Sequence, residues 1–91
     1  MSVTVRVPTV LQKLTDGRAE VHAAGQTVGD VLNALRSTHH DFVQRITTDV
    51  GDVKPFLNVF VNGEDIRFNG ELRAPVRDGD ELSIVPSVAG G

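Results

Sequence analysis

The segment Gly25–His40, GQTVGDVLNALRSTHH, predicts the helix around which the remaining elements are arranged. Thr27 can cap the helix N-terminus. Asp30, three residues later, approximates a capping box and places a negative charge near the positive end of the helix dipole. The apolar positions that follow form one stripe on a helix: Val28, Val31, Leu32 and Leu35. We therefore predict a helix over residues 28–38.

Two strands are predicted before this helix. In SVTVRVP (residues 2–8) three valines alternate with polar residues, which is the period of a half-buried strand, and the final proline removes a backbone donor and ends it. RAEVHAA (residues 18–24) is a weaker strand, joined to the first by a polar stretch around Asp16-Gly17. We expect the two strands to pair as an antiparallel hairpin.

The part of the chain after the helix predicts a second helical stretch, two main strands and several turns. DFVQRI (residues 41–46) is the helical stretch, and a polar loop follows over residues 47–54. PFLNVFVNGEDIRF (residues 55–68) contains a strand that ends at the strong turn signal Asn62-Gly63. Two further turn signals, Asn-Gly and Asp-Gly, bracket a short irregular stretch before the last strand, ELSIVP (residues 81–86).

Alternation in these two strands predicts which side chains face the helix. The residues expected to face it are Leu57, Val59, Val61, Leu82 and Ile84. The residues expected to face away are Asn58, Phe60, Ser83 and Val85. An exposed apolar patch on a sheet often marks a partner-binding surface, so Phe60 and Val85 are the candidates for one. The alternative is a register shifted by one residue, which would place Phe60 in the core.

The predicted elements follow the order β-β-α-(α)-β-(β)-β. This order describes an α+β domain with one main helix packed across a mixed sheet. It is the β-grasp, or ubiquitin-like, arrangement, in which the last strand is central and pairs with the first. We expect one domain over residues 1–86 and a flexible tail over residues 87–91.

The composition excludes several classes of chemistry. The chain has 91 residues and no cysteine, which excludes disulfides, thiolate metal sites, iron–sulfur clusters and a cysteine nucleophile. Its net charge is −3, and the acidic surplus lies in residues 51–91, which disfavours nucleic-acid binding and suits a partner with a basic groove. No signal peptide or membrane span is evident, so we expect a cytoplasmic protein.

No catalytic constellation is evident within the predicted domain. The adjacent His39 and His40 point apart and lack the spacing of metal ligands, so we expect a solvated helix end and no metal site. The acidic clusters Glu64-Asp65 and 78–81 lie in turns without evident pocket walls, and no nucleophile elbow or phosphate-binding glycine loop occurs. We therefore expect a protein on which enzymes act, and not an enzyme.

The C-terminal sequence VPSVAGG moves the predicted chemistry to one carboxylate. Pro86 limits the directions in which the chain can leave the last strand, and the five residues after it reach at most about 17 Å. The two terminal glycines are either a frayed end or the narrow part of a tail that enters another protein's active site. On the second interpretation the carboxylate of Gly91 is the reactive group. The residues recognised by the partner would then be Val88, Ala89 and Gly90.

With a β-grasp body, a Pro-x-Val-Ala-Gly-Gly end and no cysteine, the chain resembles the ThiS/MoaD-type sulfur-carrier proteins, the prokaryotic relatives of ubiquitin, over essentially its whole length. The segments FLNVFVNGEDIRFNGEL and DGDELSIVPSVAGG look most like the CysO-like carriers of cysteine biosynthesis. Thiamin-pathway carriers are typically shorter and would lack much of residues 39–54. Molybdopterin-pathway members commonly have Thr at the position of Ala89.

The resemblance implies a two-stage reaction on Gly91. An E1-like enzyme uses ATP and Mg²⁺ to adenylate the terminal carboxylate, and a sulfur donor then replaces AMP to leave a thiocarboxylate. In CysO-like systems this group delivers sulfide to an activated serine on a PLP-dependent cysteine synthase, and a JAMM-type metalloprotease releases the resulting adduct. The resemblance implies a free carrier that is a monomer, binds no cofactor of its own and does not associate with membranes.

The sequence leaves several alternatives open. The chain could be a molybdopterin synthase small subunit or a thiamin-pathway sulfur carrier. It could also be a ubiquitin-like covalent modifier, in which Gly91 forms an isopeptide bond with a lysine of a target protein, because the same adenylated tail serves both reactions. A non-covalent interaction module with an incidental Gly-Gly end is the third possibility.

Overall fold

The computed structural model describes residues 2–86, which form strands, two α-helices and three short 3-10 helices. In chain order they are β1 (Val3–Arg6), η1 (Thr9–Thr15), β2 (Glu20–Ala23), α1 (Val28–Thr38), α2 (His40–Ile46), β3 (Leu57–Val61), β4 (Glu64–Asp65), η2 (Ile66–Phe68), η3 (Glu71–Arg73) and β5 (Glu81–Pro86). The order of strands and α-helices confirms the prediction, and α1 has the predicted bounds.

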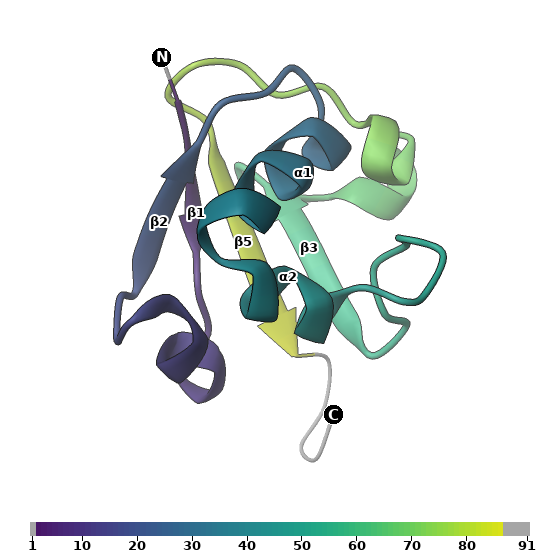
Figure 1. Cartoon of the computed structure of the whole chain (residues 1–91). Coiled ribbons are helices and arrows are strands. Elements are labelled where there is room, and N and C mark those ends of the chain that lie inside the picture. The colour runs from purple at the N-terminus through teal and green to yellow at the C-terminus, as the bar shows by residue number, and fades with distance from the viewer. Residues whose placement is uncertain (1, 87–91) are drawn as a thin grey trace.

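The strands form one mixed sheet in the order β2-β1-β5-β3-β4 (Figure 1). β5 is central, because it runs parallel to β1 on one side and antiparallel to β3 on the other. β1 and β2 are antiparallel, with Val5 opposite Val21, which confirms the predicted hairpin. The first and last strands therefore lie side by side in the middle of the sheet, as the β-grasp arrangement requires.

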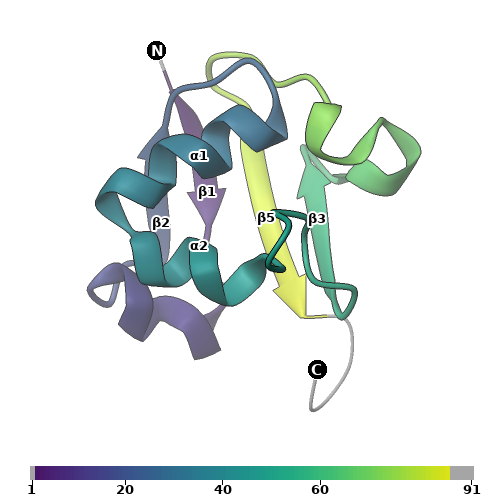
Figure 2. The ribbon, with the colours of Figure 1, turned by 45° about the vertical axis from the view of Figure 1, so that its right-hand side comes forward.

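The two α-helices cover one face of this sheet (Figure 2). The Oγ1 of Thr27 accepts a hydrogen bond of 3.1 Å from the backbone N–H of Asp30, which confirms the predicted helix cap. The Asp30 carboxylate accepts the N–H of Gln26 at 3.3 Å, so the reciprocal bond of the capping box goes to the residue before the cap. α2 begins at His40, one residue before the predicted stretch.

The hydrophobic core lies between these helices and the covered face of the sheet. The stripe predicted for α1 is buried throughout: Val28, Val31, Leu32 and Leu35. The strand residues that complete this layer include Val3, Val5, Leu57, Val59, Leu82 and Ile84. Phe42 of α2 is the largest fully buried side chain among the described residues. Because each such side chain contributes about 1.5–3 kcal/mol when fully buried, the core fixes the central strand firmly.

The connection between β1 and β2 differs from the predicted polar stretch. It contains η1, whose Leu11 is buried and whose buried Thr15 hydroxyl donates to the backbone carbonyl of Arg18 at 2.9 Å. Asp16 follows with a left-handed backbone, φ 56°, so the signal Asp16-Gly17 marks the end of this helix. A short 3-10 helix has no apolar stripe of period 3.6, which is why the pattern did not predict it.

The segment between β3 and β5 contains several short ordered elements, of which η3 (Glu71–Arg73) lies in the stretch that was predicted as irregular. Asn62 and Gly63 have positive φ angles of 49° and 87°, which confirms the predicted turn, and the two residues of β4 pair with the end of β3. η2 and η3 follow, separated by Gly70 with φ 97°. The segment folds back so that Ile66 joins the core.

Candidate functional site at the end of the central strand

The predicted reactive tail begins where β5 ends. Pro86 lies opposite Leu57, the first residue of β3, so the tail leaves the body at a position set by neighbouring strands. The predicted site residues Val88, Ala89, Gly90 and Gly91 lie outside the residues that the structure describes. Five residues reach at most about 17 Å, whereas the shortest extent of the molecule is 24 Å. An enzyme that takes the terminal residue must therefore contact this end of the body.

β5 provides a fixed origin for the tail because it is paired on both edges. It pairs with β1 over residues 81–83 and with β3 over residues 82–86. Leu82 and Ile84 point into the core and are buried. Residues 84–86 pair with β3 alone, so the pairing of Pro86 with Leu57 sets the position of Pro86 for an approaching partner.

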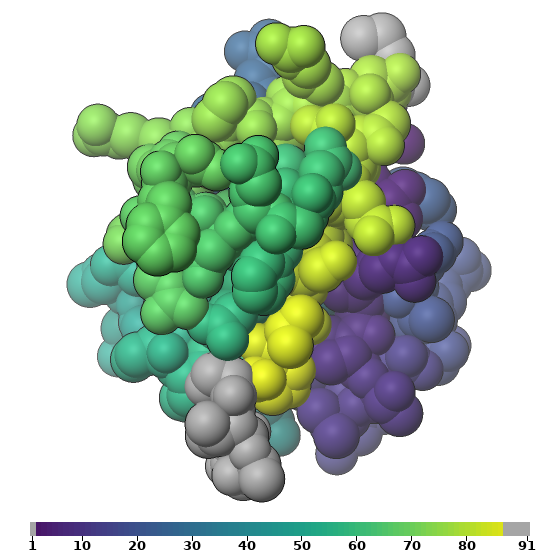
Figure 3. All heavy atoms as spheres, turned by 180° about the vertical axis from the view of Figure 1, so that it is seen from behind, coloured from purple at the N-terminus to yellow at the C-terminus, as the bar shows by residue number. Residues whose placement is uncertain are grey.

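Phe60 and Val85 lie on the uncovered face of the sheet. The pairing places Phe60 opposite Ser83 and Asn58 opposite Val85, while Val59 between them is buried. The predicted register is therefore confirmed, and the alternative with Phe60 in the core is wrong. Val85 is 42% exposed and Phe60 is half-buried. Figure 3 shows this face, with β5 running in yellow between β1 and β3.

Two ion pairs lie beside this part of the uncovered face, on the side of β1. Arg6 Nε lies 2.9 Å from Glu81 Oε2, and Arg6 Nη2 lies 3.5 Å from Glu20 Oε2. The pKa of Arg6 is raised, chiefly by its hydrogen bond to Glu81. These three exposed side chains link β2, β1 and β5 across the sheet, so charged groups border the apolar patch of Phe60 and Val85 on that side.

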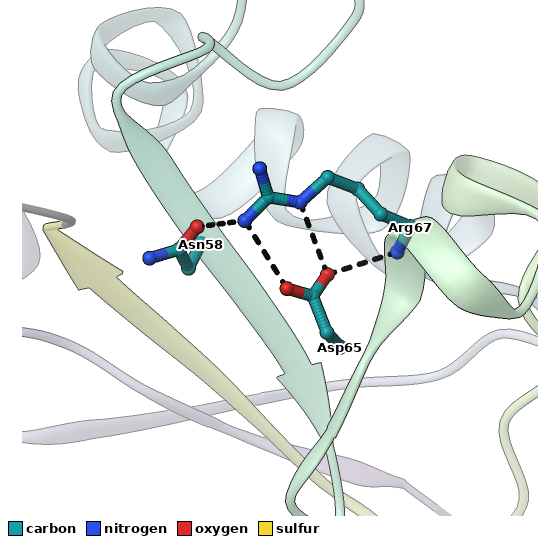
Figure 4. A network of polar contacts seen from close by, with 3 residues as sticks. All are labelled: Asn58, Asp65 and Arg67. Carbon is teal, nitrogen blue, oxygen red and sulfur yellow. Dashed lines mark hydrogen bonds and ion pairs between the residues drawn. The ribbon is translucent and has the colours of Figure 1, made fainter.

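A second polar cluster lies at the outer edge of β3. The Arg67 guanidinium donates to Asn58 Oδ1 and to both carboxylate oxygens of Asp65, at 3.1 and 3.3 Å, and the backbone N–H of Arg67 donates to Asp65 at 2.9 Å (Figure 4). These bonds, the side-chain one foremost, lower the pKa of Asp65. Sequence reasoning described Glu64-Asp65 as a solvated acidic turn and missed the role of Arg67, because the bond from Arg67 to Asn58 joins η2 to β3.

His39 and His40 lie apart from the candidate site. His39 joins α1 to α2, and its backbone N–H donates to the Leu35 carbonyl at 2.6 Å. His40 is exposed, with Nδ1 at 3.6 Å from Asp41 Oδ1. Within residues 2–86, no three His, Asp or Glu side chains gather as metal ligands would. No helix in the same part of the chain is long and apolar enough to cross a membrane.

The structure also contains a groove that sequence reasoning missed. It has a volume of about 440 Å³ and lies between the loop after α2, the start of β3 and the 3-10 helices η2 and η3. Its walls come from three segments separated in sequence, and no single motif marks them. Leu57 lines this groove and also lies opposite Pro86, so the groove and the origin of the tail share one strand end.

Comparisons with known proteins agree with this architecture. A family model described as the ThiS family matches residues 5–91. The chain belongs to the ThiS family. The sulfur carrier protein CysO of Mycobacterium tuberculosis strain H37Rv is 40% identical to this ThiS-family chain over 93 aligned positions, which cover the whole of both chains.

Two further similarities bear on function. A chain in the crystal structure of the Amycolatopsis orientalis BexX/CysO complex superposes with a TM-score of 0.90 at 44% identity, covering 98% of this ThiS-family chain and 99% of that one. Small archaeal modifier protein 3 of Haloferax volcanii is 40% identical over 65 residues, or 71% of this chain and 70% of that protein. The ubiquitin-like β-grasp fold predicted from the sequence is thereby confirmed.

Proposed function

We propose that this chain is a sulfur carrier whose C-terminal Gly91 is adenylated by an E1-like enzyme and converted to a thiocarboxylate. The observation that carries the proposal is the end-to-end similarity to the sulfur carrier protein CysO, which includes the region of the Gly-Gly tail. The position of the tail supports it, since the last residues follow directly from the central strand.

The chemistry proceeds in two balanced steps. The carboxylate of Gly91 attacks the α-phosphate of ATP, forming an acyl-adenylate and releasing pyrophosphate, with Mg²⁺ supplied in the activating enzyme. A sulfide-level donor then attacks the acyl carbon and displaces AMP, which leaves the thiocarboxylate. The protein's own contribution is to deliver the terminal residue in line with the nucleotide, and glycines without Cβ atoms allow the backbone to enter a narrow channel.

The body of the domain provides recognition in this proposal. Phe60 and Val85 form an apolar patch on the uncovered face, and Val85 precedes the last residue of β5. An enzyme that receives the tail can rest on these side chains, because Val85 precedes Pro86 and Phe60, opposite Ser83, lies farther along the same face. We propose the patch as the contact for the E1-like enzyme, with Val88, Ala89 and Gly90 recognised inside its channel.

The proposed acceptor of the sulfur is a PLP-dependent cysteine synthase carrying an activated serine. A JAMM-type metalloprotease would then hydrolyse the carrier–cysteine adduct and restore Gly91. The similarity to CysO proteins at 40% and 44% identity favours this route over the molybdopterin and thiamin routes. The reactions that we propose place the protein in the cytoplasm, where ATP is available.

A second function is supported by the similarity to small archaeal modifier protein 3. A covalent modifier would use the same adenylated Gly91, but the acyl group would pass to the amine of a lysine and release AMP. The product would be an isopeptide and not a thioacid. The two functions therefore differ in the nucleophile, and the product identifies it.

Intact mass spectrometry distinguishes these functions. The purified chain is incubated with its cognate E1-like enzyme, ATP, Mg²⁺ and a sulfide source. A mass gain equal to the exchange of one oxygen for one sulfur supports the carrier. Conjugates to lysines of other proteins in a cell extract, without this gain, support the modifier. If neither product forms with an active enzyme, the proposal is wrong.

A further inference from the structure

The groove beside β3 combines an apolar floor with a charged rim. The apolar residues that line it are Val53, Leu57, Val59, Ile66 and Leu72. The charged residues that line it are Asp52, Asp65 and Glu71 on the acidic side and Lys54 and Arg67 on the basic side. Its volume of about 440 Å³ lies within the range of binding pockets and exceeds that of a single side chain.

Two highly exposed apolar residues lie in segments that contribute lining residues to the groove. Val50 is 84% exposed and lies in the loop between the lining residues Thr48 and Asp52. Phe68 is 86% exposed and follows the lining residue Arg67. Both segments lie on the β3 side of the molecule (Figure 2). Apolar side chains so exposed beside an apolar groove mark a protein-binding surface, and aromatic residues are enriched at such surfaces.

Local hydrogen bonds fix the backbone at both residues. Around Val50, the N–H of Thr48 donates to the Asp52 carbonyl at 2.7 Å and the N–H of Gly51 donates to the Thr48 carbonyl at 2.9 Å. Before Phe68, Arg67 is held by Asp65. The exposed side chains are thus presented by ordered turns, which reduces the entropy lost when a partner covers them.

The charges of the rim indicate a basic partner. Asp65 is neutralised by Arg67, whereas the carboxylates of Asp52 and Glu71 and the ammonium of Lys54 form no ion pair within residues 2–86. Three carboxylates face two cations, so the groove carries a net negative charge. A partner that places a Lys or Arg beside an apolar side chain complements this arrangement.

The wall of the groove also contains an unsatisfied polar atom. The Oγ1 of Thr48 is shielded from solvent and has no hydrogen-bond partner among the described residues. A buried hydroxyl without a partner is uncommon in folded proteins. Because this atom is already shielded from solvent, it forms no part of the surface that a partner would meet.

We infer that this groove, together with Val50 and Phe68, is the docking surface for the sulfur-accepting partner, which presents apolar side chains next to a basic residue. The inference rests on the proposed carrier function, since two enzymes must then receive the same tail in succession. Two surfaces of different chemistry can be reached from the end of β5: the uncovered face, with Val85 next to Pro86 and Phe60 farther along, and the acidic groove that begins at Leu57. One serves activation and the other serves transfer.

Separate assays of the two steps test the inference. Formation of the thiocarboxylate is followed with the cognate E1-like enzyme. Sulfur transfer is followed from the isolated thiocarboxylate to the cognate PLP-dependent synthase with its activated serine. In the double variant Val50→Ser/Phe68→Ser we expect unchanged thiocarboxylate formation and a KM for transfer that is higher by about tenfold or more, since several exposed anchors are lost together.

Matched variants control for general effects of the substitutions. Val10→Ser removes a comparably exposed valine, 68% exposed, from η1 on the β1–β2 side of the molecule (Figure 1), and both steps should stay unchanged. Glu71→Lys should weaken transfer, whereas Glu64→Lys at the start of β4, where the side chain does not line the groove, should not. Each of these side chains is exposed, so the fold should tolerate the changes.

The outcomes separate this inference from the proposed function. If Val50→Ser/Phe68→Ser transfers sulfur normally, or if thiocarboxylate formation falls equally, the assignment of the groove is wrong while the carrier function stands. If the unaltered chain forms no thiocarboxylate with an active E1-like enzyme, the proposed function fails and the inference fails with it.

Discussion

Replacement of Phe60 by alanine separates its role in binding from its role in stability. A fully buried Phe removes about 150–250 Å² from water. Phe60 is half-buried, so its truncation loses about 100 Å² of burial. At about 25 cal/mol per Å² this is at most about 2.5 kcal/mol, and a compact unfolded state lowers it. We expect a loss of about 1–2 kcal/mol in the free energy of unfolding and a clear loss of affinity for the E1-like enzyme.

Phe42→Ala is the matched control, because Phe42 is fully buried and contributes nothing to the surface. It should lower the free energy of unfolding by about 3–5 kcal/mol. Urea unfolding gives the stabilities, and calorimetric titration with the E1-like enzyme gives the affinities. If Phe60→Ala destabilises the domain as much as Phe42→Ala, or leaves the affinity unchanged, the reasoning about the uncovered face is refuted. Alanine is preferred to aspartate, which would face Asp65 directly across the strands.

Three further changes test other parts of the account. Thr27→Ala should lower the free energy of unfolding by about 1 kcal/mol and Tm by about 4–8 °C, because it removes the helix cap. Thr27→Ser keeps a hydroxyl at the cap and should lose little stability. Equal losses in the two variants would contradict the role of the cap. Hydrogen bonds from the Asn62 side chain and from the backbone N–H of Arg77 lower the pKa of Asp80. The ionised Asp80 therefore stabilises the folded state fully above the unfolded-state pKa of about 3.9, and this stabilisation is lost as the pH falls through the lower folded-state pKa. Urea unfolding from pH 6 downward should therefore show a smaller acid-induced loss in Asp80→Asn, and an unchanged loss would contradict the assignment. Deletion of Gly91 should abolish ATP–pyrophosphate exchange by the E1-like enzyme and leave Tm unchanged; retained exchange would exclude the terminal carboxylate as the reactive group.

The parts of the fold with a regular apolar period could be predicted from the sequence. The α1 stripe and the alternation in β3 and β5 each repeat over several residues, so the buried faces were identified correctly. The turn at Asn62-Gly63 was predicted because both residues tolerate the positive φ that it requires. The central position of β5 followed from the β-grasp arrangement.

The features that were not predicted depend on contacts between distant segments. η1 is short, has no side-chain cap at Pro8, and was described only as a polar connection. Arg67 and Asn58 are nine residues apart in the sequence, and the chain reverses direction between them, so neither residue alone indicates their hydrogen bond. The exposure of Val50 and Phe68 is decided by where their turns lie relative to β3, and apolar residues in a sequence do not reveal this. The reactive tail therefore stays a prediction from the sequence, and the groove was not predicted at all.

The most direct test of the central claim locates the sulfur atom within the chain. Arg77 is the last Lys or Arg in the sequence, so trypsin releases residues 78–91 as one peptide that carries the tail. After reaction with the E1-like enzyme, ATP, Mg²⁺ and a sulfide source, fragmentation mass spectrometry of this peptide should show one oxygen replaced by sulfur at Gly91. A peptide 78–91 that remains unmodified, or that carries its mass change at another residue, would contradict the account.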